Sequence, residues 1–303
     1  MTESQSAADR HSSPLRYPGG KSKLTAYIKR ILEDNQLVGG HYAEPYAGGA
    51  SVALGLLFDE YVSNIHINDL DRSIYSFWHS VIHETEALCR LVSDAKLSPA
   101  AWRRQRAVQS DNNASILERG FSTLYLNRTN RSGIITGGMI GGSEQAGEWK
   151  LDVRYNASGL ISRIERIASY GSRITLSRLD ASTFLLKRVP RLPERSLVYL
   201  DPPYFVKGQQ RLYANYYEPE DHQDIANLVA GLERPWLVSY DDAPEIRQLY
   251  APHRRLVYGL DYTAAERYEG AEVMFFCFGL VVPSGKDPVS FGRSGSRSAR
   301  VGR

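Results

Sequence analysis

The hydrophobic and polar positions near the start of the 303-residue chain follow two different periods. Residues 41–45 and the alternating stretch NIHIND at 64–69 are typical of strands, whereas the apolar stretch at 50–58 between them is typical of a helix. Another helix is predicted at 22–35, ahead of the first strand. A strand, a helix and a second strand in this order form a parallel sheet that is covered on both faces.

The pattern changes over the next hundred or so residues, where the signals for strands nearly vanish. The helical period predicts one long helix at 73–95 and further helices at 113–126 and 157–170. A glycine-dense loop, TGGMIGGSEQAGEW, lies before the last of these helices. We interpret residues 72–171 as an inserted, mostly helical recognition domain.

The alternation of strands and helices then resumes. Strands are predicted at 173–179, 196–201, 236–241, 255–262 and 271–282, and helices at 181–188, 219–232 and 243–249. A short linker joins the last two strands, which predicts an antiparallel pair at one edge of the sheet. The predicted fold class is therefore α/β, with a doubly wound sheet in which residues 14–71 and 172–283 form one domain around the insert.

The composition is that of a soluble globular protein, because 42% of the residues are hydrophobic and 23% are charged. The longest apolar run, Val273–Pro283, is too short to span a bilayer and predicts a buried strand. The N-terminus lacks the apolar stretch of a secretory signal, and two cysteines are too few for a disulfide framework. We expect a cytoplasmic protein that acts as a monomer and does not contact a membrane. Residues 1–13 and the basic tail at 284–303 are expected to be disordered.

Arginines are concentrated in the expected insert, although the net charge of the whole chain is only +3. Between residues 100 and 133 the positive charges are Arg103, Arg104, Arg106, Arg119, Arg128 and Arg131. The same stretch contains only two carboxylates, Asp111 and Glu118. This cluster is compatible with binding to nucleic acid, and a solvated helical face is the alternative.

The tetrapeptide Asp201-Pro202-Pro203-Tyr204 follows a predicted buried strand, at the position where open α/β sheets bind their ligands. The Asp201 carboxylate and the Pro202 carbonyl can accept the two N–H groups of an aromatic amine and stabilise the positive charge that develops there. The two prolines stiffen the loop, and Tyr204 offers a flat face on which an extruded base can stack. A simple strand-ending turn is the alternative, which the position after a central strand disfavours.

A glycine turn follows the first predicted strand, in the sequence YAEPYAGGAS. Gly48 and Gly49 lack a Cβ atom and let the backbone approach a ligand before the next helix begins. Asp69 ends the next strand, at a distance suited to a carboxylate that binds ribose hydroxyls. A purely structural turn is the alternative. A nicotinamide fingerprint requires GxGxxG, which this loop does not contain, so an oxidoreductase is disfavoured.

Together these motifs resemble the Dam-type DNA adenine methyltransferases. The resemblance runs from about Leu15 to Val282 and rests on LRYPGGKSKL, YAEPYAGGASV, INDLD, LYLNRTNRSGI, VYLDPPY and the strand near EVMFF. It implies a Rossmann-like sheet that binds S-adenosyl-L-methionine (SAM) and carries an inserted DNA-recognition domain. It also implies that double-stranded DNA is the partner and that a flipped adenine is methylated on its N6 amine.

The resemblance further implies the residues of the cofactor site. The family positions that match Tyr17, Lys21, Asp69 and Asp201 contact SAM, and many members have tryptophan where this chain has Tyr17. Lys21 would bind the methionine carboxylate, and a surface lysine at the start of a helix is its alternative. Asp180 matches a residue that holds the cofactor's adenine amine, and a helix N-cap is its alternative. The motif around the glycine turn adds Glu44, Pro45, Tyr46 and Gly48 to the expected SAM contacts.

Two further segments match parts of the family that contact DNA. Tyr213 and Tyr216, in LYANYY, resemble a loop that closes over the target base, with buried packing as the alternative. The segment LNRTNRSGI matches the entry into a DNA-reading hairpin and makes Arg128, Asn130 and Arg131 candidates for contacts with phosphates or bases. The loop that follows, GGMIGGSEQAG, departs from the better-known members, so the target sequence is left open.

We therefore predict a DNA adenine methyltransferase. The alternatives are a methyltransferase of cytosine N4, one of adenine in RNA, and a catalytically inactive DNA-binding module, which intact Asp201 and Lys21 disfavour. A role in restriction–modification, in a phage or in regulation is open. No metal is expected, because His79 and His83 have metal-ligand spacing on a predicted helix but lack a pattern of further ligands.

Overall fold

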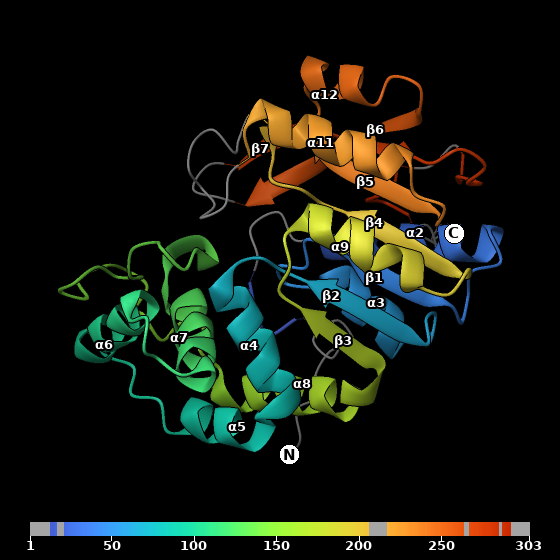
Figure 1. Ribbon diagram of the computed structural model, residues 1–303. Helices are drawn as coiled ribbons and strands as arrows, with labels where there is room; N and C mark the ends of the chain where they lie inside the picture. Colours follow the sequence, from blue (N-terminus) through green and yellow to red (C-terminus); the bar gives the residue numbers. More distant parts are fainter. Residues whose placement is uncertain (1–12, 17–20, 206–216, 264–266, 285–286, 292–303) are drawn as a thin grey trace, which may run out of the picture.

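The computed structural model describes residues 13–16, 21–205, 217–263, 267–284 and 287–291. Within these residues seven strands form one sheet with the order β3-β2-β1-β4-β5-β7-β6 (Figure 1). The strands are β1 (His41–Glu44), β2 (Asn64–Asn68), β3 (Ile174–Ser177), β4 (Ser196–Leu200), β5 (Trp236–Asp241), β6 (Arg254–Thr263) and β7 (Arg267–Phe276). Strands β1 to β5 pair in parallel, and β7 is antiparallel to both β5 and β6. This order confirms the predicted Rossmann-like α/β sheet and its antiparallel edge.

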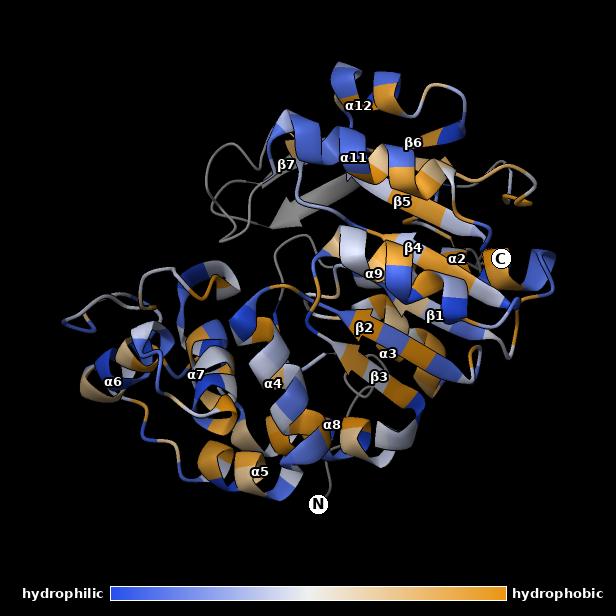
Figure 2. Cartoon of the chain, viewed as in Figure 1, coloured by the Kyte–Doolittle hydropathy of each residue, from blue (hydrophilic) through white to orange (hydrophobic). Residues whose placement is uncertain are grey.

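Helices cover both faces of the sheet, because the central strands are apolar on both sides. Every residue of β4 and β5 is buried, and Figure 2 shows the hydrophobic character of these strands. One face packs against η1 (Lys21–Leu24), α2 (Thr25–Asp34) and α3 (Ser51–Phe58). The other face packs against α9 (Ala181–Lys187), α11 (Pro219–Ala230) and α12 (Pro244–Leu249). The sheet is thus held between two apolar layers, and the carboxyl ends of its parallel strands are where a site can form.

Five α-helices follow one another between β2 and β3. They are α4 (Arg72–His83), α5 (Thr85–Ser93), α6 (Pro99–Ser110), α7 (Ile116–Thr129) and α8 (Ala157–Ser169). Helix α7 packs against α4 and α6, and α8 packs against α5 (Figure 1). Buried side chains of α4, α7 and α8 belong to the same apolar core as those of β2. The helical content matches the predicted insert, and a separate recognition domain over 72–171 remains an interpretation.

Two helices of this block differ from the prediction. The single long helix expected at 73–95 is two helices, because Glu84 leaves the helical conformation with φ of −132° and ψ of 33°. The helix expected at 113–126 begins after Ser115, whose side chain opens a capping box, and it continues to Thr129.

The C-terminal part also departs from the prediction. The apolar run expected to form a buried strand leaves the sheet after Phe276, and Phe278 is 74% exposed. Residues 287–291, expected to be disordered, form a turn. The Phe291 ring of this turn packs edge-on against Tyr27, with the ring centroids 5.4 Å apart. The expectation failed here because this aromatic contact joins residues far apart in the chain, and the polar composition of the tail does not reveal it.

The described residues contain neither a membrane-spanning helix nor a metal-binding cluster. No helix among them is long and apolar enough to cross a membrane. No cluster of three or more His, Cys, Asp or Glu side chains in the same residues could hold a metal ion. His79 and His83, four residues apart on α4, pack against each other with ring centroids 4.7 Å apart.

Candidate active site

The carboxyl ends of the parallel strands lie along one edge of the sheet. Strand β1 leads to α3 on one face and its neighbour β4 leads toward α11 on the other, so the two strands form a topological switch point. Asp201 comes directly after β4, and Asp69 directly after β2. Asp180 follows β3 and precedes α9. Three carboxylates predicted to be in the site therefore lie along the edge where ligands bind in such folds.

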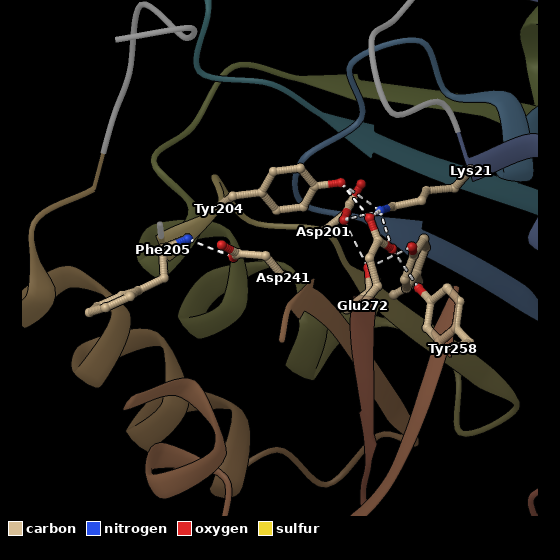
Figure 3. A network of polar contacts seen from close by, with 9 residues as sticks. Lys21, Asp201, Tyr204, Phe205, Asp241, Tyr258 and Glu272 are labelled. Atoms are coloured by element: carbon tan, nitrogen blue, oxygen red, sulfur yellow. Dashed lines mark hydrogen bonds and ion pairs between the residues drawn. The ribbon is translucent and has the colours of Figure 1, made fainter. Parts of the chain in front are cut away.

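Lys21 lies at the centre of a buried polar network at this edge (Figure 3). Its Nζ atom donates hydrogen bonds to both carboxylate oxygens of Glu272 at 2.8 Å and to the Tyr204 hydroxyl at 2.9 Å. Nζ also lies 3.4 Å from Asp201 Oδ1, and the Lys21 side chain is only 5% exposed. The alternative of a surface lysine is therefore wrong. Burial lowers the pKa of Lys21, but the carboxylates of Asp201 and Glu272 outweigh it, so the pKa is raised overall.

The two carboxylate oxygens of Asp201 have different surroundings. Oδ1 accepts a hydrogen bond from Ser239 Oγ at 2.8 Å and faces Lys21. Oδ2 has no hydrogen-bond partner among the described residues, and the side chain is 27% exposed. Burial raises the pKa of Asp201, Lys21 opposes this effect, and Glu272 adds to it, so that the pKa is raised overall. One oxygen of Asp201 is fixed by the protein, and the other can accept an N–H group from a ligand.

The loop after β4 is held at Tyr204 and at the next residue. The Tyr204 hydroxyl donates to Glu272 Oε1 at 2.7 Å, and the tyrosine is almost buried. The backbone N–H of Phe205 donates to Asp241 Oδ1 at 2.8 Å. The two prolines between Asp201 and Tyr204 are buried and half-buried, respectively. The two prolines therefore stiffen the loop, and side chains from β5 and β7 also hold it in place.

The glycine turn after β1 is tied to the end of β2. Gly48 has a positive φ of 46°, and its backbone N–H donates to Asp69 Oδ2 at 2.8 Å. The other oxygen, Oδ1, accepts from the N–H of Asp71 at 2.9 Å. Burial, and then the charge of Asp71, raise the pKa of Asp69 to about 7. Asp69 remains half-buried, so its carboxylate is placed beside the turn without being sealed into the core.

Glu44, at the end of β1, points into the protein. Its Oε1 atom accepts hydrogen bonds from the Tyr42 hydroxyl at 3.0 Å and from the N–H of Ala53 at 3.2 Å. Burial raises the pKa of Glu44 to about 8, although these two hydrogen bonds lower it. In this structure Glu44 therefore links the strand to α3.

Three further residues of the expected cofactor site make local contacts. The Pro45 carbonyl accepts from Asn68 Nδ2 at 3.0 Å. The hydroxyls of Tyr46 and Tyr217 share a hydrogen bond of 2.9 Å. Asp180 is exposed and caps α9, where it accepts a backbone N–H at 2.9 Å. A contact with the adenine amine of the cofactor and a role as a helix N-cap are thus both compatible with the position of Asp180.

The candidate DNA contacts of the insert separate into buried and exposed residues. Arg128 is 8% exposed, and its Nε atom donates to the Pro14 carbonyl at 2.8 Å. Burial and three neighbouring arginines lower the pKa of Arg128 to about 9. Asn130 is fully buried and donates to two backbone carbonyls of the turn that follows. Arg131 is exposed on that turn, so Arg128 and Asn130 brace the segment that displays Arg131.

The sequence patterns did not point to Glu272 or Ser239 as site residues. Both lie within apolar strands, and β7 is antiparallel, so Glu272 meets the site from within its strand and not from beyond its carboxyl end. A glutamate directly before the apolar run VMFFCF was the available signal, because a buried charge needs partners. Tyr17, Tyr213 and Tyr216 lie outside the described residues.

Comparison with known proteins gives one match over most of the chain. The profile of the family described as D12 class N6 adenine-specific DNA methyltransferase matches residues 17–262. No curated protein is significantly similar to the chain.

Similar solved structures share little sequence with the chain. One is PH1948 from Pyrococcus horikoshii, 10% identical over 87% of this chain and 86% of that chain, with a TM-score of 0.42. Another is the rRNA methyltransferase AviRa from Streptomyces viridochromogenes, 15% identical over 90% of this chain and 94% of that chain, with a TM-score of 0.39. TrmK from M. capricolum, solved with S-adenosyl-homocysteine, is 6% identical over 82% of this chain and 68% of that chain, with a TM-score of 0.34.

Proposed function

Because the chain belongs to the D12 class N6 adenine-specific DNA methyltransferase family, we propose that it methylates the N6 amine of adenine in double-stranded DNA. Membership in the family makes the protein a SAM-dependent methyltransferase. The choice of an amine substrate rests on how the two carboxylate oxygens of Asp201 are bonded. Its Oδ1 atom is held by Ser239, while Oδ2 has no partner among the described residues and can accept an N–H group.

The groups along the sheet edge fit SAM. The sulfonium of SAM supplies an electrophilic methyl group. Asp69 lies beside the glycine turn, where its carboxylate can accept hydrogen bonds from the ribose hydroxyls. Asp180 is exposed at the end of the neighbouring β3 and can accept a hydrogen bond from the adenine amine of the cofactor. Lys21 is enclosed by two carboxylates, so we assign it to the side of the target amine and not to the methionine carboxylate.

The proposed chemistry depends on two acceptors at the end of β4. An aromatic amine is a poor nucleophile, because its lone pair is delocalised into the ring. Asp201 Oδ2 and the Pro202 carbonyl accept its two N–H groups, which favours a pyramidal nitrogen and stabilises the positive charge that develops there. The methylated nitrogen is then positively charged and has to release one of its two protons. The raised pKa of Asp201 suits it to accept this proton.

Access to DNA is the second part of the proposal. An adenine stacked inside a duplex cannot reach this edge of the sheet, so the base has to leave the stack. The Tyr204 ring, fixed by its hydroxyl, would support the extruded base. In Figure 1 helices α4, α6 and α7 of the insert lie to the left of β2 and β3. The exposed Arg103, Arg104 and Arg131 of the insert can neutralise phosphates of the duplex.

The proposal is tested by incubating the protein with isotope-labelled SAM and long duplex DNA and analysing the digested nucleosides by mass spectrometry. Label is expected in N6-methyldeoxyadenosine, and Asp201→Ala protein is the control. Label in N4-methyldeoxycytidine, or only in RNA offered in the same assay, would overturn the proposed substrate but keep SAM-dependent transfer. Binding of SAM without label in any nucleic acid would instead favour the inactive DNA-binding module.

A further inference from the structure

Glu272 lies in the middle of β7, where this antiparallel strand passes the ends of the parallel strands. It pairs in register with Asp241 on β5 and with Tyr258 on β6. Its side chain is fully buried. Figure 3 shows that the carboxylate points from β7 toward Lys21 and Tyr204. A charged residue therefore enters the site from the antiparallel edge of the sheet.

The hydrogen bonds to Glu272 use both of its oxygens. Oε1 accepts from Lys21 Nζ at 2.8 Å and from the Tyr204 hydroxyl at 2.7 Å. Oε2 accepts from Lys21 Nζ at 2.8 Å and from the Tyr258 hydroxyl at 2.8 Å. A carboxylate offers about four acceptor positions, so these donors satisfy it. Buried charge is costly to retain unless it is paired in this way, and a specific role at this position would account for it.

The position of Lys21 between two carboxylates has a consequence for Asp201. Nζ makes its short contacts with Glu272 at 2.8 Å and stays 3.4 Å from Asp201 Oδ1. Without the charge of Glu272, the ammonium would be attracted to Asp201 alone. A close ion pair there would draw the carboxylate toward Lys21 and reduce its basicity toward an amine. Glu272 therefore keeps Lys21 near Asp201 and prevents a close ion pair between the two.

Glu272 acts on Tyr204 as well. The tyrosine hydroxyl is bonded to Glu272 Oε1 and to Lys21 Nζ, which fixes the direction of the ring. A tyrosine that stacks on a base needs such fixation, because stacking depends on the plane of the ring. Asp201 and Tyr204 are the two ends of one tetrapeptide, and Lys21, which Glu272 holds, contacts both.

We propose that Glu272 is a positioning residue for methyl transfer, which holds Lys21 and Tyr204 so that Asp201 and the Tyr204 ring are presented together to the target amine. The inference rests on the proposed function, in which Asp201 accepts the N–H group of that amine. A merely structural Glu272 would brace β7 against the loop after β4, and its replacement would lower stability without changing the properties of Asp201.

A double-mutant cycle separates the two roles. We expect Glu272→Gln to slow single-turnover methylation of duplex DNA by at least about 30-fold at saturating SAM and DNA, because the positioned contacts are lost. Lys21→Met removes the group through which Glu272 reaches Asp201. Glu272 also holds Tyr204 directly, so the two losses overlap in part. The double variant is therefore expected to lose less than the product of the two single losses, whereas independent roles would multiply them. Multiplying losses, or a wild-type rate for folded Glu272→Gln, would overturn the proposal.

The pH dependence of the rate gives a readout that a structural brace would not move. The described titratable neighbours that affect Asp201, or are affected by it, are Lys21, Tyr42, Glu44, Tyr199, Tyr258 and Glu272. The charge of Glu272 raises the pKa of Asp201. Glu272→Gln should therefore shift the acidic limb of the pH–rate profile to lower pH while the plateau falls. An acidic limb that stays in place would contradict the proposal.

Two controls keep the test decisive. Tyr258→Phe removes one donor to Glu272 but leaves its contacts with Lys21 and Tyr204, so we expect a lower melting temperature with less than about a threefold change in rate. If Glu272→Gln does not fold, Glu272→Asp retains the charge but shortens the reach, and it is expected to lose rate at least about tenfold. A wild-type rate in folded Glu272→Asp would then overturn the proposal.

A measurement on the free protein distinguishes failure of this inference from failure of the proposed function. With ¹³C-labelled tyrosine, the Tyr204 resonance can be assigned by its loss in Tyr204→Phe. We expect this resonance to shift and broaden in Glu272→Gln, with or without nucleic acid. An unchanged resonance would overturn the positioning role, even in a protein that methylates DNA. A shifted resonance in a protein that labels only cytosine or RNA would keep that role and reject adenine in DNA.

Discussion

The backbone N–H of Gly48 donates a 2.8 Å hydrogen bond to Asp69 Oδ2, which joins the turn after β1 to the end of β2. The Gly48 carbonyl in turn accepts from Trp78 Nε1 at 2.9 Å. The turn is therefore held from β2 on one side and from α4 on the other. Both contacts place the Asp69 carboxylate beside a stretch of backbone that a ligand can approach.

The first prediction concerns the affinity for SAM. Asp69→Ala is expected to weaken SAM binding by about 1.5–3 kcal/mol, since a charged acceptor for the ribose hydroxyls is lost. Isothermal titration calorimetry on the folded variant measures this loss. Asp152→Ala, which removes an exposed carboxylate in the insert, is the matched control. Equal SAM affinity in wild type and Asp69→Ala would return Asp69 to a structural role in the turn.

The pH dependence of SAM binding is a second prediction from the same residue. Burial raises the pKa of Asp69 to about 7, so a large part of the free protein carries a neutral Asp69 at neutral pH. The ionised form is the better acceptor for hydroxyl groups. Affinity for SAM should therefore rise as the pH increases from about 6 to about 8 and then level off. The same titration with Asp69→Asn should lack this rise, and a rise of equal size in that variant would assign it to another group.

The third prediction tests the acceptor for the target amine. Asp201→Ala is expected to reduce methyl transfer at least about 100-fold while the protein stays folded, as for loss of one preorganised electrostatic contact. Ser239→Ala should have a smaller effect, because it loosens Oδ1 and leaves the carboxylate in place. Single-turnover rates at saturating SAM measure both changes. Near-normal turnover in folded Asp201→Ala would falsify the mechanism.

A fourth prediction links the buried Glu44 to stability. Burial raises the pKa of Glu44 from 4.5 to about 8, so the folded protein holds this proton more tightly than the unfolded chain. The stabilisation is fully present below the unfolded pKa, and it is lost as the pH rises through the folded pKa. The free energy of unfolding should thus fall between about pH 5 and about pH 8, by up to about 1.4 kcal/mol per pH unit for this group.

Glu44→Gln removes that titration and keeps an oxygen for the Tyr42 hydroxyl and the Ala53 N–H. The variant should lose less stability than wild type over the same pH range. Urea unfolding at about pH 5.5 and about pH 8 measures the difference. Asp69 titrates in the same direction in both proteins and cancels in the comparison. Parallel pH curves for the two proteins would show that Glu44 keeps its ordinary pKa.

The periodicity of the sequence was sufficient to locate the strands of the sheet, but it did not predict where every helix and strand ends. Short apolar or alternating runs between turn residues located β1, β2 and β4, because a buried strand has few other sequence patterns. The break at Glu84 could not be predicted, since HETE contains neither glycine nor proline and α5 turns away to pack on α8. The end of β7 was also hidden, because the apolar run continues after Phe276 while the chain turns at Gly279, with φ of 81°.

The site was predictable where its residues follow strands. Asp69 and Asp201 lie after parallel strands, so their shared edge follows from topology alone. Glu272 lies inside an antiparallel strand, and its role depends on pairing that sequence patterns do not specify. The burial of Arg128 likewise depends on the Pro14 carbonyl, 114 residues away in the chain. Long-range polar contacts are the part of the site that a single sequence does not contain.

Arg128 and Arg131 provide a matched pair for the last prediction. They are three residues apart, but Arg128 is buried against the Pro14 carbonyl while Arg131 is exposed. Arg128→Ala leaves that carbonyl without its donor and should lower the free energy of unfolding by about 1–3 kcal/mol. Its relative preference among target sequences should stay the same. Arg131→Ala should leave the melting temperature unchanged, because its side chain lies in solvent.

Methylation of a randomised duplex library by each variant tests the two roles. If Arg131 reads a guanine, Arg131→Ala should weaken recognition of the target DNA by about 1–3 kcal/mol and relax one position of the target sequence. An arginine makes hydrogen bonds to both acceptors of that base. An Arg131 that binds a phosphate should weaken methylation of all sequences alike and reduce the dependence on salt. A library methylated by Arg131→Ala at wild-type rates and with wild-type preferences would show that this arginine does not contact the DNA.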